Sequence, residues 1–201
     1  MRKLIIGTVG ALALAATPAH AVSIIADTVI DFVDSGAGPL AGPYGGTFPG
    51  TFPVSVPLTY AIDGDETTFV SLPTGSYIDL GFSSGVVFDG VGNDIFIREL
   101  GAQSEVADVF VSSDFGATFT FLGQADGGTL TELDLGSIGF AGLVNAIRIV
   151  GLDNGGASPG FDVAFVEGLE GSVIAVPVPA PAALALLGAG LVLLGVGRRR
   201  A

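Results

Sequence analysis

The stretch Gly75-Ser-Tyr-Ile-Asp-Leu-Gly-Phe82 decides the fold class of this chain. Apolar side chains occupy every second position, at Ile78, Leu80 and Phe82. A period of two is typical of a β-strand with one face on a core and the other toward water. The intervening residues, Asp79 among them, are therefore expected to face solvent.

Similar runs, rich in valine, isoleucine, phenylalanine and threonine, recur between glycine, aspartate and serine turns. They predict strands over residues 29–33, 76–82, 85–88, 94–99, 107–112, 118–123, 131–135, 146–152 and 161–167. The glycine- and proline-rich stretch 36–57 is expected to be a loop or an irregular strand connection. We therefore predict an all-β sandwich forming one domain over residues 22–172.

The N-terminal residues have the three regions of a secretory signal peptide. A basic pair, Arg2 and Lys3, precedes an apolar run, and small residues stand at Ala19 and Ala21. We expect a signal peptide over residues 1–21, and the alternative is a retained N-terminal anchor.

The C-terminal residues predict a second targeting segment. A proline-rich linker over 173–181 precedes an apolar run over 182–197 and a basic end over 198–201. The run is shorter than the roughly 20 residues of a comfortable membrane-spanning helix. The arginines fit the cytoplasmic face of the inner membrane. The alternative is an ordinary C-terminal anchor behind a proline-rich linker.

This tail resembles the PEP-CTERM family of bacterial sorting signals, most closely its VPLPA variant. The residues that carry the likeness are Val176, Pro177, Val178, Pro179, Ala180, Arg198, Arg199 and Arg200. Val178 stands where the variant more often has leucine. The resemblance implies recognition by an exosortase, a membrane-held stage during export, and a final place at the cell surface or outside the cell.

The charge between the two ends excludes several functions. Only Arg98 and Arg148 oppose twenty acidic residues there, a formal charge of −18. Such a domain repels nucleic acid, whose phosphates require lysine and arginine, whereas it suits divalent cations. The only histidine, His20, lies in the expected signal peptide, and the chain has no cysteine. Histidine triads, thiol nucleophiles and the usual zinc ligands are therefore excluded.

Six segments together resemble discoidin-type, galactose-binding-like domains over residues 58–170. They are Ala61-Ile-Asp-Gly-Asp-Glu-Thr-Thr-Phe69, Gly75-Ser-Tyr-Ile-Asp-Leu-Gly81, and the stretches 90–99, 111–119, 147–152 and 160–167. The resemblance implies an eight-stranded jelly roll that often carries a structural calcium ion. Fold likeness says much less about the ligand.

The resemblance also implies which residues would hold that calcium. Asp63, Asp65 and Thr68 lie on a tight Asp-Gly turn, and Asp162 stands where relatives have an acidic residue entering the last strand. Calcium takes oxygen ligands of these kinds. The alternative is a favourable turn with solvated carboxylates.

A second acidic group surrounds the predicted strand 94–99. Asp94 and Glu99 are an odd number of positions apart, so they are poor candidates for one site. We expect a structural role for this group, with Glu99 beside Arg98 or in solvent. Among the aromatic residues, Tyr44 and Phe48 in the early loop are the expected exposed ones, and the alternative is that either folds onto the sandwich.

We therefore expect an exported, non-catalytic surface or extracellular-matrix protein. The alternative is a carbohydrate-binding module for exopolysaccharide. A glycoside hydrolase, which needs only two carboxyl groups, is the distant alternative.

Overall fold

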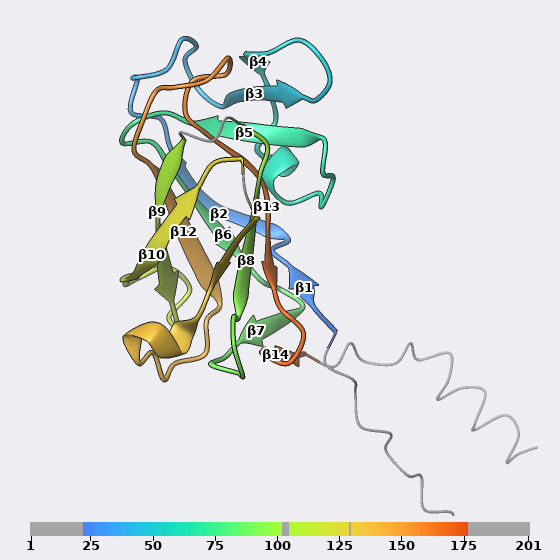
Figure 1. The fold of residues 1–201 in the computed structure, drawn as a ribbon, viewed down its shortest axis with the longest axis vertical. Helices are drawn as coiled ribbons and strands as arrows, with labels where there is room; N and C mark the ends of the chain where they lie inside the picture. The colour runs from blue at the N-terminus through green and yellow to red at the C-terminus, as the bar shows by residue number, and fades with distance from the viewer. Residues whose placement is uncertain (1–21, 102–104, 129, 177–201) are drawn as a thin grey trace, which may run out of the picture.

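Two antiparallel sheets face each other across an apolar core in the computed structural model, which describes residues 22–101, 105–128 and 130–176 (Figure 1). The larger sheet has the order β11 (Leu130–Leu133), β8 (Ile95–Glu99), β13 (Phe161–Gly168), β5 (Thr68–Leu72), β3 (Tyr44–Thr47) and β4 (Val54–Ser55), with β1 (Ile24–Ile25) also paired to β13. The smaller sheet has the order β10 (Thr120–Asp126), β9 (Val106–Ser112), β12 (Ala146–Gly151), β6 (Tyr77–Gly81) and β2 (Thr28–Val33). A separate pair joins β7 (Gly85–Val87) to β14 (Val173–Ala175).

The predicted all-β sandwich is confirmed, and each predicted strand is present to within a few residues. The described residues form fourteen strands, more than the eight implied by the resemblance. The additional strands include β3 and β4, which lie within the predicted loop 36–57. Glycine permits this because the backbone of β3 lies close against β5, with no room for a side chain at Gly45.

The strand β5 was not predicted, although it lies between β13 and β3 in the larger sheet. All five of its residues are buried. A strand that is covered on both faces shows no alternation of polar and apolar residues, so the period-two pattern cannot find it. The short 3-10 helix η1 (Leu58–Ala61) contacts β5 and β13.

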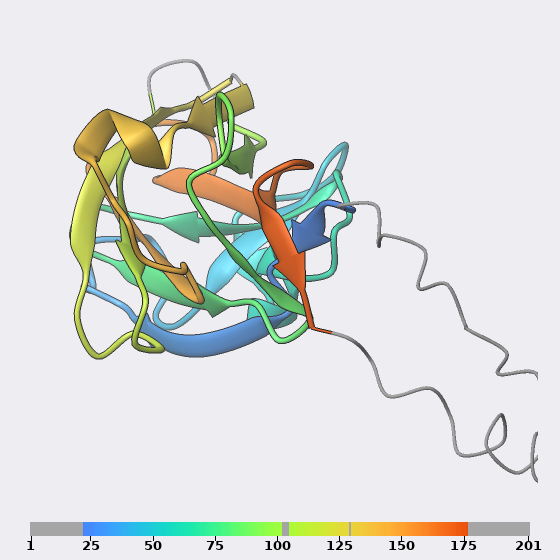
Figure 2. The same cartoon turned by 90° about the horizontal axis from the view of Figure 1, so that it is seen from below.

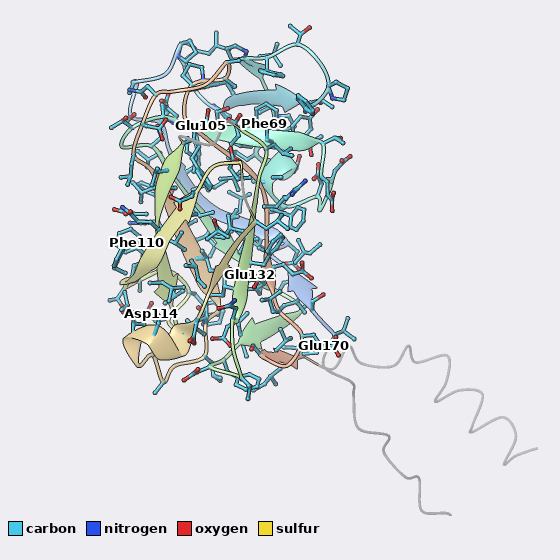
Figure 3. All side chains as sticks on the ribbon, in the orientation of Figure 1. Phe69, Glu105, Phe110, Asp114, Glu132 and Glu170 are labelled. Atoms are coloured by element: carbon cyan, nitrogen blue, oxygen red, sulfur yellow. The ribbon has the colours of Figure 1, made fainter. Side chains whose placement is uncertain are left out.

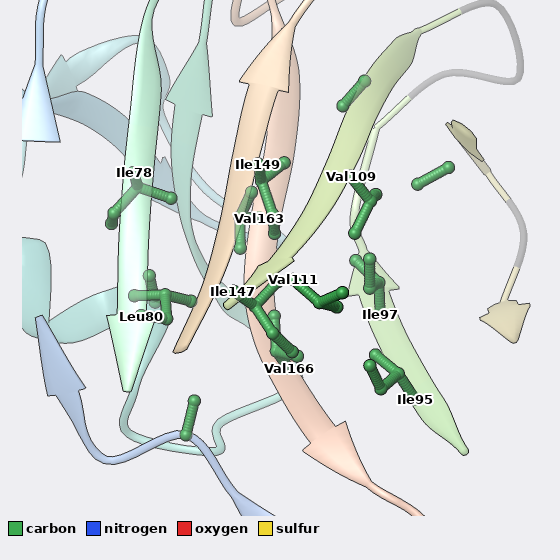
Figure 4. Close-up of a cluster of buried hydrophobic side chains, with 14 of the residues drawn as sticks. Ile78, Leu80, Ile95, Ile97, Val109, Val111, Ile147, Ile149, Val163 and Val166 are labelled. Carbon is green, nitrogen blue, oxygen red and sulfur yellow. The ribbon is translucent and has the colours of Figure 1, made fainter. Parts of the chain in front are cut away.

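Aliphatic side chains from both sheets fill the core (Figure 4). The smaller sheet contributes Ile78 and Leu80 from β6, Val109 and Val111 from β9, and Ile147 and Ile149 from β12, and these pack toward Ile95, Ile97, Val163 and Val166 of the larger sheet. Each such side chain stabilises the fold by about 1.5 to 3 kcal/mol on full burial. This core holds the sandwich in a chain that has no cysteine.

The prediction that Asp79 faces water is wrong, because its side chain is only 3% exposed. Asp79 lies opposite Arg148 of β12, and Nε and one terminal nitrogen of Arg148 each donate to its carboxylate at 2.7 Å. The guanidinium also lies 4.0 Å from the ring centre of Tyr77 and 4.3 Å from that of Phe119. The outer face of the smaller sheet is therefore partly covered by its own ion pair.

Both ends of the described domain lie at one end of the sandwich, where β1 and β14 are found, whereas β3 and β4 lie at the other (Figures 1 and 2). Among residues 22–101, 105–128 and 130–176, no helix has the length and apolarity needed to cross a bilayer. The expected signal peptide, the apolar segment 182–197 and the sorting residues from Pro177 onward lie outside the described residues. These assignments stay predictions.

Candidate functional site

The loop predicted to bind calcium satisfies its own polar groups. The Thr68 hydroxyl donates to both carboxylate oxygens of Asp63 at 3.0 and 3.1 Å. The carboxylate of Asp65 accepts from the backbone N–H and the hydroxyl of Thr67 at 2.8 and 2.7 Å. The structure thus brings Asp63 and Thr68 together and turns Asp65 toward Thr67.

Asp162 lies apart from that loop. It is paired across the sheet with Ser71, whose hydroxyl donates to Asp162 Oδ1 at 2.5 Å. Ser71 is three residues along β5 from Thr68, about 10 Å at the usual rise of a strand. Asp162 therefore belongs to a different group of side chains.

That group, which we call the carboxylate cluster, consists of Glu99, Glu105 and Asp162. One carboxylate oxygen from each lies within 4.8 Å of the others. Glu99 ends β8, Glu105 directly precedes β9, and Asp162 is the second residue of β13. The cluster thus combines residues from the larger sheet, which contains β8 and β13, with Glu105 at the start of β9 in the smaller sheet. Figure 3 shows Glu105 at the same end of the sandwich as Phe69.

All three side chains of the carboxylate cluster are buried, with exposed fractions of 4, 1 and 3% for Glu99, Glu105 and Asp162. The expectation that Glu99 lies beside Arg98 or in solvent is therefore wrong. Residues of β8 alternate between the core and the outside, and Glu99 falls on the same face as Ile95 and Ile97.

Hydrogen bonds satisfy only part of the carboxylate cluster. Glu99 accepts from the backbone N–H groups of Gly101 and Gly128. Ser71, which donates to Asp162, also shares a hydrogen bond of 2.7 Å with Ser158. By contrast, Glu105 Oε2 is buried and has no hydrogen-bond partner among the described residues.

Electrostatics in the carboxylate cluster strongly favour either protons or a cation. Burial raises the pKa of Glu105 to about 9, and repulsion from Asp162 and Glu99 adds to this. Burial also raises the pKa of Asp162 to about 8, and it raises the pKa of Glu99. The ion pairs among the described residues are Arg98–Glu66 and Arg148–Asp79, so neither arginine neutralises the cluster.

A second group, Asp89, Asp94 and Asp134, also brings its oxygens within 4.8 Å. Here both carboxylate oxygens of the buried member, Asp94, have hydrogen-bond partners. Asp94 accepts from the N–H groups of Gly90 and Leu135 at 2.9 and 2.8 Å and from the hydroxyl of Ser172 at 2.5 Å. Asp134 caps the 3-10 helix η2 (Leu135–Ile138). These bonds give Asp94 the structural role expected from the sequence.

A surface groove of about 430 Å³ lies beside the carboxylate cluster, bordered by Phe48, Glu66, Arg98 and Leu130. The Phe48 side chain is 54% exposed, as expected from the sequence. Tyr44 follows the alternative: its ring is buried, and its hydroxyl donates to the carbonyl oxygen of Pro159.

Arg98, which borders this groove, carries an unsatisfied donor. Its Nε atom is buried and has no hydrogen-bond partner within the described part of the chain. Its terminal nitrogen lies 3.8 Å from a carboxylate oxygen of Glu66, which is a loose ion pair at the surface. Arg148, in contrast, is held by Asp79. The sequence did not indicate Arg98 as a binding residue, because the residues next to it in the chain do not distinguish it from other exposed strand positions.

No family model matches the chain, and no curated protein matches it. Similar solved structures include the CBM32 module of AlyQ in complex with 4,5-unsaturated mannuronic acid, at 17% identity and a TM-score of 0.43, covering 71% of this chain and 96% of that one. A chitosan-binding module from a Paenibacillus chitosanase/glucanase has 20% identity and a TM-score of 0.38, covering 54% of this chain and 82% of that one. The C-terminal domain of a Bacteroides fragilis chitobiase has 14% identity and a TM-score of 0.42, covering 73% of this chain and all of the other. With TM-scores this low, the ligand has to be argued from the residues of this chain.

Proposed function

We propose that the domain is a non-catalytic carbohydrate-binding module that binds sugar in the groove between Phe48 and Arg98. The observation that carries the proposal is that one groove is bordered both by the exposed aromatic side chain of Phe48 and by Arg98, whose buried Nε has no hydrogen-bond partner among the described residues. Sugar rings pack their C–H faces on aromatic side chains, and a few polar groups fix their orientation. Arg98 can donate to hydroxyls, and Glu66 can accept from them.

The aromatic platform is anchored in the core. The ring centre of Phe48 lies 6.5 Å from that of Phe52, and the Phe52 ring meets the buried Phe69 edge-on at 5.5 Å. Packing of this kind holds Phe48 in place before a ligand arrives, which reduces the ordering cost of binding. The groove volume also falls within the usual range for small-molecule sites.

The charge of the domain favours neutral sugars. The chain between its two expected targeting segments has two arginines against twenty acidic residues, so the domain repels polyanions at low ionic strength. Arg98 and Glu66 together offer donors and acceptors to the hydroxyls of a neutral ring. We therefore expect neutral hexose polymers to bind more tightly than polyuronates of the same length.

Burial of the carboxylate cluster supports binding over hydrolysis. A glycoside hydrolase needs two carboxyl groups that flank the scissile bond and touch the sugar. Glu99, Glu105 and Asp162 are each at least 96% buried as residues, and Glu99 is the one of the three that borders the groove, so the cluster does not offer a bound sugar two exposed carboxyl groups. We expect bound oligosaccharides to be recovered intact, without new reducing ends.

The test is a glycan array probed with the full chain, followed by titration calorimetry with the sugars that bind. We expect Phe48→Ala and Arg98→Gln each to weaken binding by about tenfold, the effect of about 1.4 kcal/mol. The matched control is Phe121→Ala, whose ring is 48% exposed on β10 and does not border the groove. Unchanged affinity in Phe48→Ala, or an array with no bound sugar, would refute the proposal.

We propose further that the chain is exported and sorted through its C-terminal tail, which would present the groove to exopolysaccharide. The position of β14 supports this geometry, because it lies at the end of the sandwich opposite β3 (Figure 1). Cell fractionation of the full chain, with and without Arg198, Arg199 and Arg200, tests the sorting step. Identical distribution of both forms would count against it.

A further inference from the structure

We propose that Glu99, Glu105 and Asp162 bind a calcium ion in the carboxylate cluster, at a site separate from the Asp63 loop. The proposal does not depend on sugar binding. Its geometry, its orphaned oxygen and its uncompensated charge each point to a bound cation.

The spacing of the oxygens suits a single ion. Calcium binds oxygen at about 2.3 to 2.6 Å, so two of its ligands on opposite sides are at most about 5 Å apart. The three carboxylates each offer an oxygen, and these oxygens lie within 4.8 Å of one another. One ion can therefore contact all three.

Glu105 contributes a buried oxygen to this group of carboxylates. Its Oε2 atom is buried without a hydrogen-bond partner in the described part of the protein, and the whole residue is 1% exposed. A buried polar atom of this kind costs free energy unless a ligand, an ion or water satisfies it.

Two glycines leave room for this arrangement. A Cβ at Gly101 would lie 1.9 Å from Glu105 Oε2 and 2.1 Å from Glu99 Oε1. A Cβ at Gly156 would lie 1.9 Å from Glu105 Oε1. Only a backbone without a side chain can approach both oxygens of Glu105 this closely, so the carboxylate is held from two sides.

The charge of the carboxylate cluster requires compensation. Three carboxyl groups are buried together, and the described ion pairs involve other residues. Burying ionised groups without a partner is expensive. A divalent cation compensates the charge and leaves the carboxylates ionised.

The donor set selects calcium among the common cations. Carboxylates, with the hydroxyls of Ser71 and Ser158 nearby, are hard oxygen donors. Calcium accepts irregular oxygen sets, whereas magnesium demands near-octahedral geometry and retains several waters. A cavity of about 200 Å³, whose lining includes Phe48, Phe52, Glu105 and Asp162, supplies an entry path.

The test is titration of calcium chloride into the chelator-treated full chain by calorimetry, with no sugar present. We expect Glu105→Gln and Asp162→Asn each to weaken binding at this site by on the order of tenfold or more, because affinity follows the charge of the ligands. Glu170→Gln, exposed at the opposite end of the sandwich, is the matched control and should leave the affinity unchanged (Figure 3).

Asp63→Asn separates this site from the loop predicted from the sequence, and it should retain binding. A thermal melt supplies a second readout. Calcium should raise the melting temperature of the wild type, since a ligand that binds only the folded state stabilises it. Glu105→Gln should melt no lower than the metal-free wild type, because it removes one of three crowded carboxyls, and it should lose the response to calcium.

Three outcomes would overturn the proposal. They are no heat of calcium binding to the wild-type chain, undiminished affinity in both Glu105→Gln and Asp162→Asn, and loss of binding in Asp63→Asn alone. The first needs no variant, so a variant that fails to fold leaves the proposal testable. None of the three involves sugar, so failure here is distinct from failure of the carbohydrate proposal.

Discussion

Single side chains in this protein show how hydrogen bonds set the behaviour of a carboxylate. Asp114 accepts from the Thr118 hydroxyl and backbone N–H at 2.7 and 2.9 Å and from the Ser112 hydroxyl at 2.7 Å. These hydrogen bonds lower the pKa of Asp114, whereas burial raises the pKa of Asp162. The residue type alone therefore says little about its charge, and the surroundings decide it.

Asp114 leads to a prediction about acid stability. Hydrogen bonds from Thr118 and Ser112 lower the pKa of Asp114 to about 2, below its ordinary value of 3.8. A lowered pKa in the folded state stabilises the fold above pH 4 or so, and this contribution is lost as pH falls through about 2. We expect Asp114→Asn to be less stable than wild type at pH 5, with the difference shrinking toward pH 2. Urea unfolding across this range measures it, and a pH-independent difference would contradict it.

The element that shapes the candidate groove is β3, because Phe48 directly follows it. Its glycines Gly45 and Gly46 lie opposite Val70 and Phe69 of β5. A Cβ at Gly45 would lie 2.1 Å from the carbonyl oxygen of Phe69. The glycine-rich composition that suggested a loop is thus what allows a strand to lie close to its neighbour.

Gly45→Ala is the corresponding test. We expect it to destabilise the domain by about 1 to 3 kcal/mol, the usual effect of overpacking, because backbone atoms of β5 cannot yield as a flexible side chain would. It should also weaken sugar binding by displacing Phe48. Thr47→Ala, exposed on the same strand, is the control and should change stability by less than about 0.5 kcal/mol. Equal melting temperatures for Gly45→Ala and wild type would show that β3 tolerates displacement.

At the scale of the whole molecule, the large excess of acidic residues makes the folded domain repel itself. Salt shortens the range of this repulsion from about 30 Å at 0.01 M to about 10 Å at 0.1 M. We therefore expect the melting temperature of the chelator-treated chain to rise with sodium chloride over this range. Differential scanning calorimetry measures it. A melting temperature that falls with added salt would mean that local ion pairs outweigh the net charge.

Calcium should act differently from sodium in the same experiment. General screening depends on ionic strength, whereas a specific site saturates at a low concentration of its ion. Calcium chloride should therefore raise the melting temperature beyond the effect of sodium chloride at equal ionic strength, and Glu105→Gln should remove the excess.

The sequence by itself determined the fold class and most strand positions, because alternation of apolar residues is a local property that burial of one sheet face imposes. It also singled out Phe48 and Asp162. It could not find β5, which is buried on both faces, or the burial of Asp79, which depends on Arg148 in another strand.

Only the tertiary structure decided the candidate sites. Glu99 ends β8 and Glu105 directly precedes β9, whereas Asp162 lies in β13, much later in the chain, and the folded sandwich brings their oxygens within 4.8 Å. Arg98 and Phe48 likewise meet in one groove through the order of β8, β13, β5 and β3. Local patterns reveal which face of a strand is buried, whereas the neighbours across that face follow from sheet order and register.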